Sequence, residues 1–76
     1  MAAFTHPLLT KREWSTLNQL IKGATPSEVS DLLGITIHSV RVDMASIAEK
    51  YKIGRIERTV SLVRQVGMPD IKHSEA

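Results

Sequence analysis

The stretch from residue 25 to residue 44 constrains the fold most, because it holds two helix starts separated by a glycine turn. Thr25 can cap a first helix, and Glu28 follows three residues later to close a capping box. Gly34 supplies a left-handed residue that ends this helix, and Thr36 can cap the next one. Two helices joined by a short turn containing glycine are typical of a helix-turn-helix unit, in which the second helix is presented to DNA.

Helical periodicity continues on both sides of this unit and predicts two further helices. Thr10 and Glu13 form a second capping box, which opens a helix that ends at Gly23. The remaining helices are predicted over about 26–33, 37–51 and 55–66. No strand-like alternation interrupts the pattern, so we predict an all-α, four-helix bundle-like domain with a central helix-turn-helix.

The domain is expected over residues 9–68, between a flexible lead-in (1–8) and a flexible tail (69–76). At 76 residues there is room for one small domain, and its core must be aliphatic because the chain has one Trp, one Tyr and one Phe. The absence of cysteine excludes disulfides and thiolate metal sites and fits a cytoplasmic protein. No apolar run has the length of a membrane span.

Catalysis and cofactor binding are not expected. The three histidines are far apart in the sequence and have no partner one helical turn away, so no metal site is predicted. No Ser/His/Asp or paired-carboxylate pattern occurs, and a domain this small has little room for a substrate or ligand pocket. The chain is therefore predicted not to be an enzyme and not to bind a small molecule.

Charge gives a weak indication of nucleic-acid binding, since the net charge is only +2. The segment 38–58 is mildly basic, with Arg41, Lys50, Lys52, Arg55 and Arg58 against Asp43, Glu49 and Glu57. This bias suits phosphate binding, although a solvated charged face has the same composition.

From residue 9 to residue 68 the chain resembles the LuxR/GerE-type helix-turn-helix domain of bacterial transcription regulators. The matching fragments, in order, are Leu9–Glu13 (LTKRE), Leu17, Gly23, Ser27–Ser30 (SEVS), Leu33–Thr36 (LGIT), Ser39–Arg41 (SVR), Ile47, Lys50–Tyr51 (KY), Ile53, Val60 and Gly67. A small GerE-like protein consisting of this domain alone is similar in length. The resemblance implies that the third helix enters the major groove and that the fourth makes a symmetric dimer contact.

The resemblance also implies particular DNA contacts. The base-reading positions of the family correspond to Arg41, Val42 and Ala45 in this chain. Arg41 can reach guanine or a phosphate, and Val42 can contact a thymine methyl group. His38, in the first turn of the same helix, is a further candidate for a base or phosphate contact. The candidate phosphate contacts are Thr36, Ser39, Lys50, Lys52 and Arg55.

Asp43 departs from the family pattern, in which histidine or another phosphate-compatible residue is usual. Phosphates repel a carboxylate, so two interpretations are open. Asp43 either accepts a hydrogen bond from a cytosine amino group or pairs with a neighbouring cation, and so modulates specificity. Alternatively, it weakens DNA binding, and the protein depends on a partner or has lost the activity.

The fourth helix is expected to make the contact between two copies of the chain in a homodimer. Val60 and Val63 can complete the monomer core, and the candidate interface residues beside them are Leu62, Val66 and Arg58. We predict a cytoplasmic, nucleoid-associated regulator that binds double-stranded DNA. The alternative is a protein-interaction module that pairs with a larger transcription regulator or RNA polymerase through the fourth helix, with weak or no DNA binding.

Overall fold

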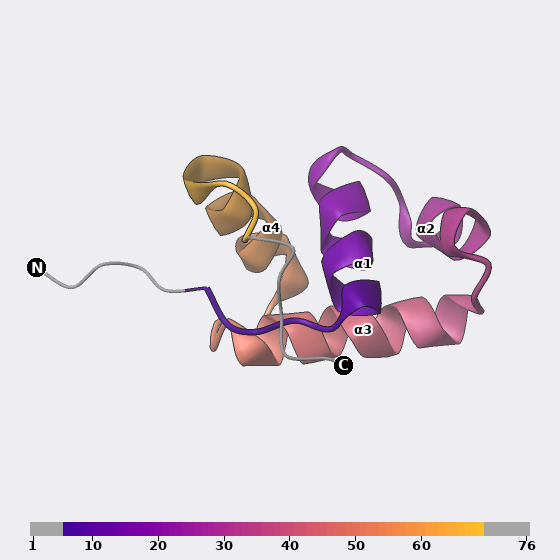
Figure 1. The fold of residues 1–76 in the computed structure, drawn as a ribbon, viewed down its shortest axis with the longest axis horizontal. Helices are drawn as coiled ribbons and strands as arrows, with labels where there is room; N and C mark the ends of the chain where they lie inside the picture. Colours follow the sequence, from indigo (N-terminus) through magenta and orange to yellow (C-terminus); the bar gives the residue numbers. More distant parts are fainter. Residues whose placement is uncertain (1–5, 70–76) are drawn as a thin grey trace, which may run out of the picture.

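A computed structural model of the chain describes residues 6–69, which fold into four helices (Figure 1). The helices are α1 (Lys11–Ile21), α2 (Pro26–Leu33), α3 (Ile37–Lys50) and α4 (Ile56–Val66). No strand occurs between residues 6 and 69. The predicted all-α, four-helix fold is confirmed, and α3 and α4 differ from their predicted ranges by one residue at one end. Of the predicted lead-in and tail, residues 1–5 and 70–76 lie outside the described residues.

Threonine caps fix where three of the helices begin. Thr10 Oγ1 accepts a hydrogen bond from the Glu13 amide at 3.0 Å, and Glu13 Oε1 accepts one from the Thr10 amide at 2.9 Å. Thr25 and Glu28 make the same reciprocal pair, so both predicted capping boxes are present. Thr36 caps α3 by accepting a hydrogen bond from the backbone amide of its third residue. Loss of such a cap typically costs about 1 kcal/mol.

α2 and α3 are each followed by a residue in the left-handed backbone conformation, which is a glycine after α2 and a lysine after α3. Gly34 ends α2 with φ 67°, as predicted, and turns the chain into α3. At the end of α3, Lys52 takes a left-handed conformation with φ 61°. Its amide donates to the Glu49 carbonyl, and the next amide, of Ile53, donates to the Ala48 carbonyl. This pattern is a Schellman motif in which lysine holds the position that glycine usually takes.

The other three helices pack against α3 from one side (Figure 1). The buried hydrophobic residues form one cluster of Leu9, Leu17, Ile47, Tyr51 and Val63 and a second of Leu20, Val29 and Val40. Ile56 and Val60 of α4 contact both clusters and join them. Because Val40 and Ile47 are fully buried, the opposite side of α3 is left facing solvent.

Polar contacts hold the residues that flank the helices. The indole N–H of Trp14, which lies half-buried against the first cluster, donates to the Pro69 carbonyl at 2.9 Å. His6 Nδ1 lies 2.7 Å from the Tyr51 hydroxyl, and burial raises the pKa of Tyr51 to about 12. Within the described part of the chain, no helix is long and apolar enough to cross a membrane.

Candidate nucleic-acid interface

The solvent-facing side of α3 brings together the four residues predicted to contact bases. His38, Arg41, Val42 and Ala45 are all exposed, and Val42 keeps 49% of its surface accessible although its side chain is apolar. Arg41 and Val42 each lie three or four residues from both His38 and Ala45, which places all four on one side of a helix with 3.6 residues per turn. We call these four residues the exposed stripe.

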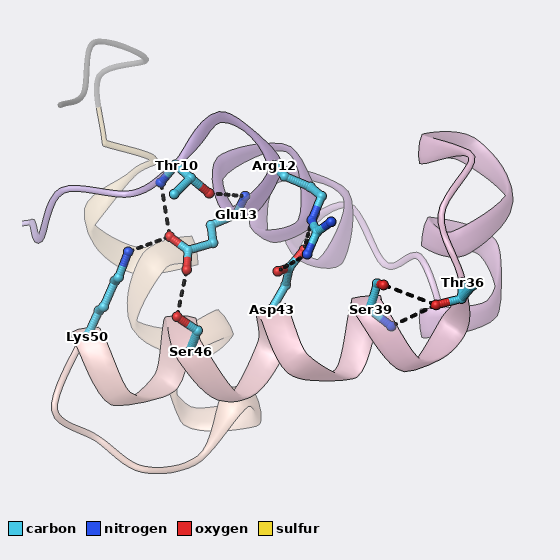
Figure 2. Close-up of polar contacts among 8 residues, drawn as sticks. All are labelled: Thr10, Arg12, Glu13, Thr36, Ser39, Asp43, Ser46 and Lys50. Atoms are coloured by element: carbon cyan, nitrogen blue, oxygen red, sulfur yellow. Dashed lines mark hydrogen bonds and ion pairs between the residues drawn. The ribbon is translucent and has the colours of Figure 1, made fainter. Parts of the chain in front are cut away.

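Two candidate phosphate contacts lie at the start of α3. The Thr36 hydroxyl accepts a hydrogen bond from the Ser39 amide at 3.1 Å and donates one to Ser39 Oγ at 3.0 Å (Figure 2). The Thr36 hydroxyl is therefore engaged in capping the helix. Ser39 Oγ only accepts in this pair, so its own hydroxyl hydrogen can be donated to an outside acceptor such as a phosphate oxygen. The backbone amides of the first turn offer further donors.

Asp43 does not belong to the exposed stripe, because its side chain points toward α1. Arg12 donates hydrogen bonds to both carboxylate oxygens, from Nε to Oδ2 at 2.7 Å and from Nη2 to Oδ1 at 3.0 Å (Figure 2). The Asp43 side chain is 7% exposed and that of Arg12 is 49% exposed. Hydrogen bonding to Asp43 and its negative charge raise the pKa of Arg12. Pairing of Asp43 with a neighbouring cation, which the sequence left open, is therefore observed, and its effect on DNA binding stays a prediction.

Lys50, a third candidate phosphate contact, is paired with Glu13 of α1. Its Nζ lies 2.6 Å from Glu13 Oε1, and Ser46 donates to Glu13 Oε2 at 2.6 Å (Figure 2). Together with the Thr10 amide, these groups bind a carboxylate whose side chain is only 7% exposed. Burial raises the pKa of Glu13, but the hydrogen bonds from Lys50, Ser46 and Thr10 lower it by more, so the net pKa falls below its ordinary value.

The two remaining candidate phosphate contacts, Lys52 and Arg55, are exposed in the connection between α3 and α4. Arg55 precedes the first residue of α4 and provides no side-chain cap. It lines a groove of about 360 Å³ that is also lined by Arg41 and Ala45. The structure thus brings Arg55 close to the exposed stripe, and the groove is lined by two cations, Arg41 and Arg55, and by one carboxylate, Glu57.

Sequence reasoning missed the partners of Asp43 and Lys50. Asp43, Ser46 and Lys50 follow one another by three and four residues, which is the spacing of a single helix face. That spacing could have indicated a polar contact with another helix. It could not have identified Arg12 and Glu13, which lie 31 and 37 residues earlier in the chain.

Glu49 was also missed as a member of the solvent-facing side of α3. It is exposed and lies one helical turn beyond Ala45 and two turns beyond Val42. Its spacings of four residues from Ala45 and seven residues from Val42 are the signal in the sequence that identifies it.

The residues predicted for a dimer contact lie along one edge of α4. Arg58 is exposed, Val66 is 46% exposed, and Leu62 is half-buried against the first core cluster. Val63 is fully buried and Val60 half-buried, so these two complete the monomer core. The outermost side of α4, opposite Val63, is polar and carries Glu57, Ser61 and Gln65.

A family model described as bacterial regulatory proteins, luxR family, matches residues 7–63. This span contains α1, α2 and α3 and the first part of α4. The match confirms the resemblance identified from the sequence fragments. No curated protein and no solved structure matches the chain. Between residues 6 and 69, no group of three or more His, Cys, Asp or Glu side chains could hold a metal ion.

Proposed function

The chain belongs to the luxR family of bacterial regulatory proteins, which are DNA-binding transcription regulators, and from this premise we propose how it binds DNA. In the proposal it is a sequence-specific regulator that inserts α3 into the major groove of double-stranded DNA. It acts in the cytoplasm, on the nucleoid, and performs no chemistry. The single observation that carries the proposal is the exposed stripe of α3.

The exposed stripe has suitable chemistry for base recognition. Arg41 has a planar guanidinium that can donate two hydrogen bonds to the N7 and O6 atoms of guanine. Val42 offers methyl groups to a thymine methyl, and its exposure supports this role because an apolar side chain gains from being covered. Ala45 is short and lets the helix approach the base edges closely. His38 can contact either a base or the adjacent phosphate.

Phosphate contacts at both ends of α3 would hold it in the groove. At its start, the Ser39 hydroxyl and the amides of the first turn, ordered by the Thr36 cap, can donate to one phosphate. At its end, Lys52 and Arg55 are exposed and can contact the flanking backbone. Lys50 can join them because an ammonium group has three hydrogens, and only one is needed for the bond to Glu13.

In this proposal Asp43 modulates specificity indirectly. Its pair with Arg12 links α3 to α1 and would help to hold the rotation of α3 about its own axis. That rotation decides which side chains face the bases, so the pair would influence base recognition without touching DNA. Two monomers related by a two-fold axis through the α4 edge of Arg58, Leu62 and Val66 would place their α3 helices about 34 Å apart, one turn of DNA.

Fluorescence anisotropy with labelled duplexes tests the proposal. The wild-type protein should bind a random-sequence duplex with an affinity that falls steeply as salt is raised, because bound cations are released from phosphates. On a duplex obtained by in vitro selection, Arg41→Ala should lower the affinity by about 1–3 kcal/mol and relax the sequence preference. Lys22→Ala is the matched control, since Lys22 is an exposed cation at the end of α1. Equal effects of the two substitutions would remove Arg41 from the proposed interface.

One observation favours the alternative function, a protein-interaction module. Arg12 and Lys50 are cations of the α1–α3 region whose charges are balanced by Asp43 and Glu13, so fewer positive charges are available to DNA than the sequence suggests. The exposed Val66 would then contact a larger transcription regulator or RNA polymerase. Absence of salt-dependent binding to any duplex at low salt would favour this function.

A further inference from the structure

Glu49 extends the exposed stripe toward the end of α3. It is exposed, and the four residues from Ala45 to Glu49 advance the helix by about one turn, or about 6 Å. If the exposed stripe faces base edges, Glu49 faces the same groove one turn farther along. The face that is offered to DNA therefore carries a cation near its start, Arg41, and a carboxylate near its end.

The position of Glu49 is unfavourable for the isolated domain. The last turn of a helix carries a partial negative charge, so a carboxylate there is repelled. Within residues 6–69, Glu49 has no ion pair or side-chain hydrogen bond to offset this repulsion. By contrast, Glu13 and Asp43 are both bound by cations. A residue that breaks a local rule without compensation is expected at functional positions.

Groove chemistry indicates what an unpaired carboxylate can recognise. A carboxylate only accepts hydrogen bonds, and the amino group of cytosine is the donor that acidic side chains contact in the major groove. Guanine and thymine present acceptors there, so neither can donate to Glu49. Adenine does present an amino donor, but its neighbouring N7 acceptor repels a carboxylate. Phosphates repel it.

We propose that Glu49 is a specificity-determining residue that accepts a hydrogen bond from a cytosine amino group and weakens binding to DNA lacking cytosine at that position. The inference rests on the proposed function, because it requires α3 to lie in the major groove. It assigns to Glu49 both a favourable contact with one base and a repulsive contact with the others, which together produce discrimination.

The test compares Glu49→Gln and Glu49→Ala with Asp31→Asn, by anisotropy and by in vitro selection of binding sites. Asp31 is a suitable control because it is exposed on α2 and lines a groove with the end of α1, and its substitution removes the same charge. Glu49→Ala is needed beside Glu49→Gln because a glutamine amide can itself bind adenine. Glu49 and Asp31 are both exposed, so the fold should be retained in all three variants, as circular dichroism would verify.

Both Glu49 variants should bind a random-sequence duplex about threefold or more tightly than Asp31→Asn does, since local repulsion is removed. Their preference for the selected duplex should fall by about fivefold or more, with loss of one cytosine position from the selected sites. The proposal would be overturned if the Glu49 variants bound the random-sequence duplex more tightly but still selected the same cytosine. It would also be overturned if their affinities and selected sites matched those of Asp31→Asn. In both cases, salt-dependent binding by the wild-type protein would leave the proposed function standing. Failure of all proteins to bind would overturn both.

Discussion

At the scale of single residues, Glu13 combines two structural roles. The same carboxylate closes the cap of α1 through Thr10 and binds Ser46 and Lys50 of α3. A capping glutamate is normally exposed, as Glu28 is at the start of α2, whereas Glu13 is buried. The beginning of α1 and its attachment to α3 therefore depend on one ionised group.

The pH dependence of stability in acid should reveal the ionisation of Glu13. The net pKa of Glu13 is below its ordinary value of about 4.5, so its ionised form is favoured by folding. Its contribution to stability is present above about pH 4.5 and is lost as the pH falls through the lower pKa of the folded state. The melting temperature of Glu13→Gln should therefore depend less on pH below about 5 than that of the wild-type protein. If the melting temperatures of the two proteins changed with pH to the same extent across this range, the role assigned to Glu13 would be contradicted.

At the scale of helices, the ranges were predictable and the partners were not. Caps and left-handed turns act over three or four residues, so Thr10, Thr25 and Gly34 marked helix boundaries in the sequence itself. The contacts of Asp43 and Lys50 depend on α1 lying across α3, which no local pattern specifies. The exposed stripe could be predicted because helical periodicity and burial of Val40 and Ile47 together decide which side faces solvent.

The pairing of α1 with α3 leads to a double-mutant prediction. Asp43→Ala should lower the free energy of unfolding by about 1–2 kcal/mol, a modest loss because Arg12 is half exposed and regains water. Arg12→Ala should then add little when made in the Asp43→Ala background, since the shared interaction is already absent. Urea unfolding of the four proteins measures this coupling. Additive effects would show that the pair does not stabilise the packing of α1 on α3.

At the scale of the whole molecule, the distribution of charge limits how strongly one copy can bind DNA. The net charge is +2, and Arg12 and Lys50 are already paired within the domain. A third cation, Arg64, donates to the Ile21 carbonyl at the end of α1. A single domain therefore offers DNA less positive charge than its sequence suggests, and two copies on one duplex would bind more tightly than one.

The α4 edge is the predicted surface for this pairing, and the structure decides which substitution tests it. Leu62 packs against the core, so a charge there would disturb folding as well as association. Val66→Asp is preferable because Val66 is 46% exposed and lies on the same edge. Sedimentation should show monomers for Val66→Asp and dimers for Ser61→Asp, whose altered residue lies on the outermost polar side of α4. The Val66 variant should bind an inverted repeat no more tightly than a half-site, because each copy then binds alone. The reverse result, with only Ser61→Asp monomeric, would move the interface to the polar side of the helix.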